Sequence, residues 1–282
     1  MRILKFFTLL IAILTLLACS FSVNVPSVRT GLTQTLEVSE PPDAAAELSQ
    51  VNIEMGAGSL QLSGGTDELV EGTIVYNVEA WKPEITRQGN TVTLSQKTSS
   101  NISFPEGNYK NNWDLKIGSM PLELSLTTGA YEGELDLGGL SITRLSIADG
   151  ASKSTVRFDQ PNASEMSMLS YKTGASEVDL LGLGNARVSQ IEFNGGVGSY
   201  TLDFTGENDK NVDVSINSGM SDITITIPAN ARAAITIDGE LSDIDLTGTW
   251  TVENNVYHAG TEGALININI SMAVGDLQLI YK

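Results

Sequence analysis

Short runs of alternating apolar and polar residues, each broken near a glycine, fill the chain from Val51 onward. One copy has apolar residues at every second position of 212–216, then Gly219, then the same alternation over 223–227. Alternation of this kind places every second side chain on one face and predicts half-buried β-strands. Gly, Ser, Thr, Val, Ile and Leu dominate the composition, which also favours strands. We therefore expect an all-β protein.

The glycines recur at a nearly constant interval, because those at positions 129, 150, 174, 196, 219 and 239 are 21, 24, 22, 23 and 20 residues apart. The predicted corner glycines are Gly56, Gly129, Gly150, Gly174, Gly196, Gly219, Gly239 and Gly275. Strand, glycine corner and strand at this period predict a β-solenoid of stacked coils. Glycine suits such a corner because it accepts positive φ and lets neighbouring coils approach closely. A β-sandwich, with turns every 8–12 residues or so, is the alternative.

The first 18 residues have the pattern of an export signal, with Arg2 and Lys5 ahead of an apolar run. That run is about 12 residues long, whereas a membrane-spanning helix needs about 20. The following Leu16-Leu17-Ala18-Cys19 resembles the lipobox of bacterial lipoprotein precursors, in which the cysteine after the cleavage site receives a lipid. We predict a signal peptide over 1–18, a lipid anchor at Cys19 and an extracytoplasmic, membrane-anchored protein. An ordinary signal peptide is the alternative.

The rest of the chain divides into three predicted parts. Residues 19–48, rich in Ser, Thr and Pro, are expected to be a lipid-anchored tether. Residues 49–115 are expected to form an N-terminal β domain, and 116–282 a β-repeat solenoid continuous with it. Between the first copy and the regular series lies an aromatic stretch with Trp81 and Trp113. This stretch is either a binding loop or a hydrophobic plug over the first coil.

Charge and residue counts exclude several functions. The formal charge is −18, and removal of Arg2 and Lys5 with the signal peptide makes it −20, which disfavours nucleic acid as a partner. Cys19 is the only cysteine and His258 the only histidine, so histidine-based triads and common zinc sites lack members. No phosphate-binding glycine loop precedes a helical segment. We expect no catalytic residue and no cofactor.

Acidic residues give the one metal hypothesis. Four acids follow the corner at equivalent places in their copies, namely Glu177, Asp222, Asp243 and Asp276. Half of a calcium-loop pattern also occurs, at Asp209, Asn211 and Asp213. These positions are weak calcium candidates, and a solvated acidic face is the alternative.

Residues 51–98 resemble the N-terminal part of the bacterial toastrack proteins. Its glycine corners and a proline between strands match Gly56, Gly58, Gly64, Gly72 and Pro83. Residues 212–248 are similar to the C-terminal domain of cell-wall-active antibiotic response proteins and to adhesin-like repeat domains. The resemblance implies a right-handed β-solenoid-like (toastrack) fold and a role in the cell envelope, in adhesion or stress response.

The expected function is therefore that of a non-catalytic adhesion, binding or structural module of the envelope. Its expected partners are the membrane, through the Cys19 lipid, and an envelope protein or glycan, with Trp81 and Trp113 as candidate contacts. An accessory protein of the envelope-stress or antibiotic response that contacts a membrane sensor is the alternative. A polysaccharide-acting enzyme comes third, because the chain is rich in the carboxylates that glycosidases use.

Overall fold

The computed structural model describes residues 28–96, 105–106 and 108–282, and this part of the chain is almost entirely β-structure. The predicted signal peptide and Cys19 lie outside the described residues. The only helices in the described part are two 3-10 turns, η1 (Glu79–Trp81) and η2 (Leu183–Ala186). Neither has the length or hydropathy of a membrane-spanning segment. The prediction of an all-β protein is confirmed.

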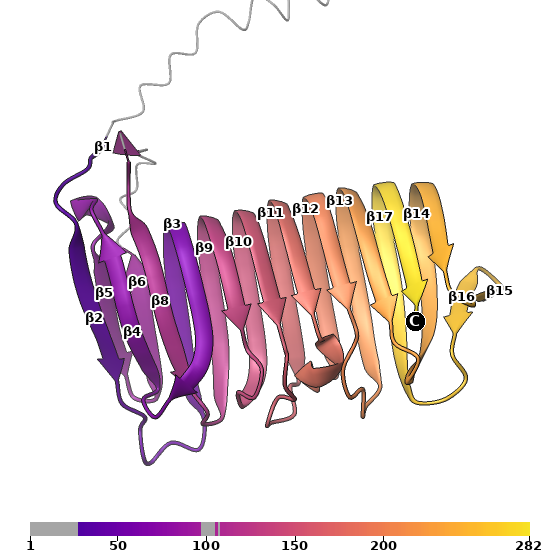
Figure 1. The fold of residues 1–282 in the computed structure, drawn as a ribbon, viewed down its shortest axis with the longest axis horizontal. Coiled ribbons are helices and arrows are strands. Elements are labelled where there is room, and N and C mark those ends of the chain that lie inside the picture. Colours follow the sequence, from indigo (N-terminus) through magenta and orange to yellow (C-terminus); the bar gives the residue numbers. More distant parts are fainter. Residues whose placement is uncertain (1–27, 97–104, 107) are drawn as a thin grey trace, which may run out of the picture.

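Eight long parallel strands form the body, and each is one rung of a stack (Figure 1). A rung runs along the far layer, turns over at the top edge and returns along the near layer, so one sheet makes both layers of the core. This in-register parallel stack is solenoid-like and is not the alternative sandwich. The rungs are β3 (Ser49–Thr66), β9 (Leu122–Asp136), β10 (Ile142–Arg157), β11 (Met168–Leu181), β12 (Gln190–Asp203), β13 (Val212–Ile227), β14 (Ala231–Thr247) and β17 (Ala264–Tyr281).

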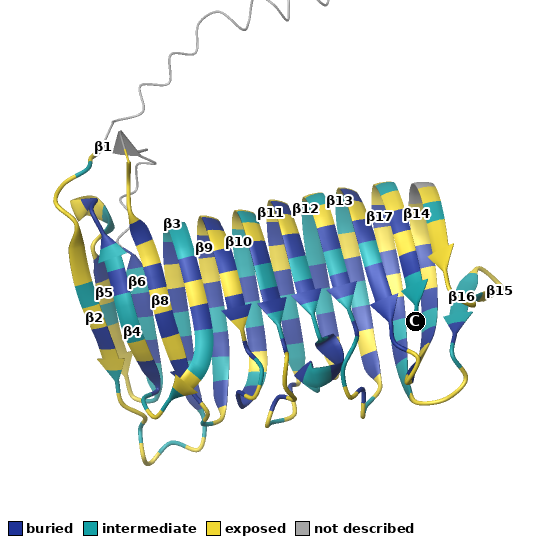
Figure 2. Cartoon of the chain, in the orientation of Figure 1, coloured by how far each residue is buried: buried dark blue, intermediate teal, exposed yellow. Residues whose placement is uncertain are grey.

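The core consists of apolar side chains in rows that cross the rungs. One row of the near layer is Leu62, Leu135, Val156, Leu180, Leu202, Ile225 and Leu279, each at most 1% exposed. Polar residues occupy the alternate, outward positions, which produces the banded burial of Figure 2. A fully buried side chain of this size contributes about 1.5–3 kcal/mol. The rows are therefore the main source of stability.

The N-terminal end is closed by shorter strands. Here β6 (Thr91–Gln96) and β8 (Asn111–Gly118) pair with the two halves of β3 as one further, divided rung. The antiparallel strands β5 (Pro83–Gln88), β4 (Val70–Tyr76) and β2 (Gln34–Glu40) then cover that rung. A separate two-stranded piece pairs β1 (Val28–Arg29) with β7 (Pro105–Glu106).

This end corrects two of the predicted boundaries. The tether was expected to extend to residue 48, but β2 is part of the sheet, and its Val38 is 2% exposed. The aromatic stretch supplies β5, β6 and β8 instead of forming a loop, and β8 crosses the predicted boundary at 115/116. Of the two interpretations of this stretch, covering the first coil agrees better with the structure.

At the C-terminal end the rungs are not stacked in chain order. The last strand, β17, lies between β13 and β14 and is parallel to both. The chain leaves β14, forms the antiparallel pair β15 (Thr251–Glu253) and β16 (Val256–Ala259), and returns to this inner position. Thus β14 is the outermost long rung, although β17 follows it in the sequence.

Asparagines in the lower loops continue the stack beyond the strands. Asn162 is fully buried; its Nδ2 donates to the carbonyls of Ile142 and Ser164 at 2.7 Å, and its Oδ1 accepts from the Ile142 amide at 2.9 Å. In the next loop, Asn185 Nδ2 donates to the Phe158 carbonyl at 2.9 Å. These side chains satisfy backbone groups that the ladders leave open.

Candidate functional site

Six of the predicted corner glycines lie side by side at the top edge. The strand registers align Gly56, Gly129, Gly150, Gly174, Gly196 and Gly219 in a single row. None of the six has positive φ. The requirement is close approach, because a Cβ on Gly196 would lie 2.2 Å from the carbonyl oxygen of Gly174. Of the two expected reasons for glycine, crowding by the next rung is the one that applies to this row.

The other two predicted corner glycines are not in this row. Gly239 pairs with Met272, and Gly275 pairs with Leu241, so each lies one or more residues away from the row. Their φ angles are 139° and 143°, values that side-chain-bearing residues rarely adopt. In β17 the position beside Gly219 belongs to Ala273. The prediction that all eight glycines occupy equivalent corner positions was therefore wrong for Gly239 and Gly275.

A shallow, open groove of about 630 Å³ follows the glycine row across four rungs, and we call it the corner groove. Its volume is within the range of about 300–1,000 Å³ that small ligands usually occupy. The missing side chains of three row glycines leave its floor as bare backbone. Its lining residues are Thr127, Thr128, Ala148, Asp149, Gly150, Lys172, Thr173, Gly174, Asn194, Gly195 and Gly196.

Asp149 is the only carboxylate among these lining residues, and hydroxyl groups hold it in place. Tyr171 Oη donates to Asp149 Oδ2 at 2.7 Å, Ser176 Oγ donates to Oδ1 at 3.3 Å, and Thr173 Oγ1 also donates to Oδ1. Asp149 is on the inward phase of β10, in line with Leu145 and Ile147, but it keeps some exposure. The carboxylate is consequently fixed and still reachable from the groove.

Buried hydroxyls with free hydrogen-bonding capacity lie beside this carboxylate. Thr128 is 6% exposed and lines the groove, yet its Oγ1 has no hydrogen-bond partner. Tyr200 is 1% exposed, its Oη also lacks a partner, and its ring lies beneath Gly195. Since an unsatisfied buried polar group costs about 1–3 kcal/mol, two in one place are unusual.

Burial also sets the ionisation of the tyrosines under the corner. Desolvation raises the pKa of Tyr131 to about 12, although a hydrogen bond with Ser154 opposes the shift. Desolvation, with the nearby Tyr131 and Asp149, raises the pKa of Tyr171 further. Burial and then Asp149 raise the pKa of Tyr200. All three phenols are therefore neutral donors at physiological pH.

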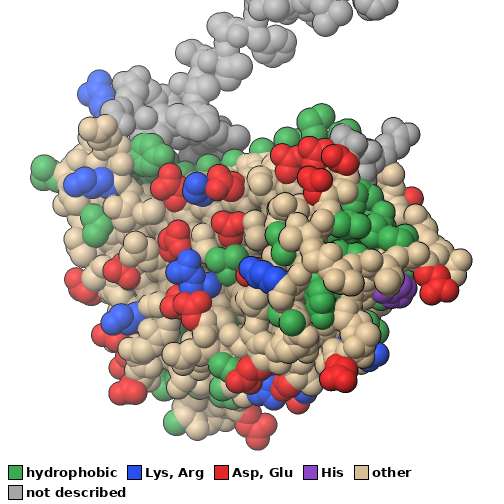
Figure 3. Space-filling view, turned by 45° about the vertical axis from the view of Figure 1, so that its right-hand side comes forward, with side chains coloured by type: hydrophobic (Ala, Val, Ile, Leu, Met, Phe, Trp, Pro, Cys, Tyr) green, Lys and Arg blue, Asp and Glu red, His purple; other side chains and the backbone are tan. Residues whose placement is uncertain are grey.

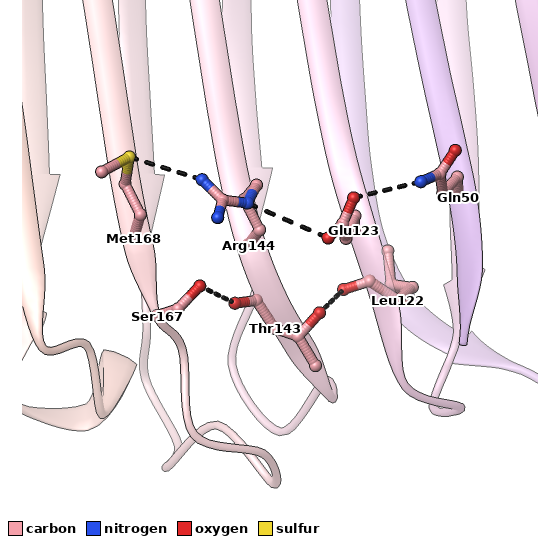
Figure 4. A network of polar contacts seen from close by, with 7 residues as sticks. All are labelled: Gln50, Leu122, Glu123, Thr143, Arg144, Ser167 and Met168. Carbon is pink, nitrogen blue, oxygen red and sulfur yellow. Dashed lines mark hydrogen bonds and ion pairs between the residues drawn. The ribbon is translucent and has the colours of Figure 1, made fainter. Parts of the chain in front are cut away.

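Polar side chains near the start of the rungs form a network that crosses four rungs (Figure 4). Gln50 Nε2 donates to Glu123 Oε2 at 3.2 Å, and Arg144 Nε lies 3.9 Å from Glu123 Oε1. Arg144 Nη1 also reaches Met168 Sδ at 3.5 Å. These groups tie four rungs together. In the groove, by contrast, the buried Thr128 hydroxyl has no hydrogen-bond partner.

The predicted acidic row exists in part. Asp222, Asp276 and Asp243 are in register on three neighbouring strands, but Ser199 separates Glu177 from them, and Glu177 pairs with Lys153 at 3.0 Å. Within the described ranges, no three His, Cys, Asp or Glu residues lie close enough to hold a metal ion. The structure supports the solvated acidic face in preference to a calcium site.

The half calcium loop is likewise used for protein contacts. Asp209 lies 3.5 Å from Arg187 Nε, Asn211 Oδ1 accepts from the Leu265 amide at 2.8 Å, and Asp213 Oδ1 accepts from Asn267 at 2.9 Å. Asn211 and Asp213 bind β17, and Asp209 pairs with Arg187 beside η2. They do not converge on an ion, so the loop hypothesis was wrong.

The two tryptophans proposed as ligand contacts have different environments. Trp113 is 1% exposed and donates from Nε1 to Asn111 Oδ1 at 2.8 Å, so it belongs to the core. Trp81, in η1, is partly exposed and packs edge-on against Tyr109 with ring centroids 5.4 Å apart. His258 lies on β16 and is partly exposed. Only Trp81 remains a candidate contact.

The sequence did not single out Asp149, Thr128 or Lys172, although one pattern could have found the first. An acid on the apolar phase of a strand, directly before a row glycine, is out of place in the alternation. Thr128 precedes Gly129 at the equivalent place one rung earlier. Lys172 is on the outward phase, where charged residues are ordinary, and only the groove distinguishes it.

Comparisons with solved structures give several similar chains. A candidate cell adhesion protein from Clostridium sporogenes has a solved structure with 22% identity and a TM-score of 0.48, covering 89% of this chain and 100% of its own. A candidate adhesin from Bacteroides fragilis gives 12% and 0.39, covering 90% and 100%. One from Parabacteroides merdae gives 10% and 0.39, covering 90% and 99%. The comparison with curated proteins gives no match.

The family comparison is decisive for classification. The family described as the N-terminal domain of toast_rack, DUF2154, matches residues 29–168 and 162–226. The two matches together span the N-terminal closure, the glycine row from Gly56 to Gly219, and the whole corner groove. Since they cover well over half of the sequence, this chain belongs to the toast_rack N-terminal domain family.

Proposed function

We propose that this protein is an extracytoplasmic binding module of the cell envelope that holds a ligand in the corner groove without transforming it. The observation that carries the proposal is the combination of bare backbone floor, fixed carboxylate and free buried hydroxyl in one groove. Ligand sites are typically concave and offer a few well-placed polar groups. The adhesin-like role expected from the sequence is consistent with such a site.

The chemistry of the groove favours a hydroxyl-rich chain, that is, a glycan. Thr127, Lys172 and Asn194 belong to one outward row and present a hydroxyl, an ammonium and an amide on β9, β11 and β12, with Ala148 in the same row on β10. Rungs are about 4.8 Å apart, so the groups repeat along the groove. Sugar hydroxyls both donate and accept hydrogen bonds, and Asp149 and Thr128 supply the complementary groups on the inner side.

The proposal includes the lipid anchor at Cys19. Because β2, the first strand of the main sheet, begins at Gln34, about 15 residue steps separate the anchor from the stack, a reach of at most about 50 Å. A ligand in the groove would consequently be held close to the membrane. This distance is shorter than the expected 30-residue tether would have allowed, since Gln34–Glu40 of that segment form a strand of the sheet.

A glycan array with residues 20–282, which contain the whole described body, tests the proposal. Lys172→Ala with Asn194→Ala removes two outward groups and should weaken binding at least tenfold, whereas Lys116→Ala, exposed on β8, should not. Equal binding by both variants would refute the groove as the site. Released oligosaccharide would overturn the non-catalytic assignment. A membrane protein captured through the groove, with no glycan bound, would favour the envelope-stress role.

A further inference from the structure

The near-layer half of β14 is a free strand edge. On its inner side β14 pairs with β17 over its whole length, but on its outer side β16 covers only Ala233–Thr236. Among the described residues no strand pairs with the outer side of 243–247. Two backbone groups there have side-chain partners instead: the Ile244 amide bonds Asp243 Oδ1 at 2.9 Å, and the Thr247 carbonyl accepts from Trp250 Nε1 at 3.0 Å.

The core is uncovered at the same place. Leu246 belongs to the inward row that includes Leu279 and Ile225, both 0% exposed, yet Leu246 is 44% exposed. Val252, in the following β15, is 56% exposed. Figure 3, turned to bring this end forward, shows a broad apolar area there. The opposite end is closed by three antiparallel strands, so the asymmetry is a property of this end.

The outward side chains at this edge are acidic. Asp243 and Asp245 are exposed on β14. Asp276 on β17 and Asp222 on β13 lie beside Asp243 in the same outward-facing row. None of these four carboxylates forms an ion pair with a described residue. A ligand strand placed beside β14 would therefore meet apolar surface on one face and negative charge on the other.

We propose that the outer edge of β14 binds an extended basic segment of a partner protein as an additional strand. In such a strand every second side chain would cover Leu246 and the end of the core, and the alternate side chains, Lys or Arg, would face Asp243 and Asp245. Backbone hydrogen bonds along 243–247 would supply affinity, and the alternating apolar and basic pattern would supply specificity. The edge is separate from the corner groove, which lies on β9–β12.

A second copy of this chain is disfavoured as the occupant. Head-to-tail stacking would place the edge strand β2, at the N-terminal end of the same layer, against β14. That strand, QTLEVSE, has Glu37 and Glu40 and no basic residue. Like charges directly opposite each other destabilise a strand pair. The charges thus favour a basic partner.

A blocked peptide of about eight residues that alternates Lys and Val is the probe, with fluorescence anisotropy as the measurement on residues 20–282. Binding should weaken at least tenfold for Asp243→Lys with Asp245→Lys, and a Glu-Val peptide should bind that variant better than the original. Asp179→Lys is the matched control, because Asp179 is in the same outward row as Asp245 but four rungs away. Unchanged binding in the double variant would overturn the proposal.

Two further measurements separate strand addition from simple charge attraction. N-methylation removes an amide donor, and the amides of alternate residues face opposite edges of a strand. A peptide N-methylated at every Lys and one N-methylated at every Val are therefore blocked on opposite edges, so one should bind and the other should not. Amides of 243–247 should also gain protection from hydrogen exchange when peptide binds. Equal binding of the two methylated peptides would refute the proposal. A concentration-dependent dimer abolished by the Asp243→Lys and Asp245→Lys variant would refute the basic partner and identify a second copy as occupant.

Discussion

Gly196→Ala tests whether close packing of the rungs explains the glycine row. The new Cβ would lie 2.2 Å from the Gly174 carbonyl oxygen and 3.1 Å from its carbon, against an ordinary minimum near 3.4 Å. The two strands would have to separate by about 1 Å at the corner, where they are bonded on both sides. Overpacking of this kind costs about 1–3 kcal/mol. Alanine also lowers the conformational entropy of the unfolded chain relative to glycine, which offsets about 0.4–1 kcal/mol of this cost. We expect a net loss near 1–2 kcal/mol.

Urea unfolding of matched variants measures this loss, and the row contains its own control. Gly56 begins the row, and a Cβ there meets only the Gln96 side chain, at 3.4 Å. Gly56→Ala should consequently change the free energy of unfolding by less than about 0.5 kcal/mol. Gly219→Ala, with its Cβ 2.7 Å from the Gly196 oxygen, should fall between the two. Equal losses at Gly196 and Gly56 would refute the crowding argument and indicate a backbone preference common to the whole row.

Three other perturbations follow from the structure. Cys19→Ala should move the protein from membranes to the soluble exported fraction, and intact-mass analysis of the unaltered protein should show a lipid adduct; unchanged fractionation without added mass would contradict the anchor. Asn162→Ala should lower the free energy of unfolding by about 2–4 kcal/mol, because it leaves backbone groups of Ile142 buried without partners. The contribution of the buried tyrosines to the free energy of unfolding should be fully present below about pH 10, the pKa of tyrosine in the unfolded chain. It should be lost as pH rises toward 12, because burial raises the pKa of Tyr131 to about 12 and also raises that of Tyr171. Phenolate absorbance rising before circular dichroism changes would argue against that coupling.

The alternation along the chain was sufficient to predict the core. Positions such as Val212, Val214 and Ile216, which alternate before a glycine, are all at most 7% exposed. The same alternation missed β2, because an edge strand buries little: within 34–40 only Val38 is buried. Proline and serine on both sides of that strand made it resemble a linker. Burial on one face is therefore readable from sequence, whereas edge strands with one anchoring residue are not.

The order of rungs and the site were less predictable, for a physical reason. Residues 212–227, 231–247 and 264–281 have similar patterns, so any two of them could pair equally well on pattern alone. The choice of β17 as neighbour of β13 depends on the connection through β15 and β16, which tertiary contacts decide. The corner groove depends on what four rungs place together. Of the residues that line the groove, only Asp149 is unusual in the sequence pattern, because it is an acid at a position where the alternation predicts an apolar residue.

The position of β17 has a consequence for biosynthesis and decay. A chain emerging from a ribosome or an export channel presents β13 and β14 before β17 exists, so the stack beyond β13 stays incomplete until the last residues arrive. The strand that finishes the fold must join a ladder on each of its two sides at once. Once it is there, β17 is held between two neighbouring rungs and is not a fraying end rung. A premature stop before residue 264 would remove an interior rung, so chains truncated there should be cleared and chains that contain β17 retained.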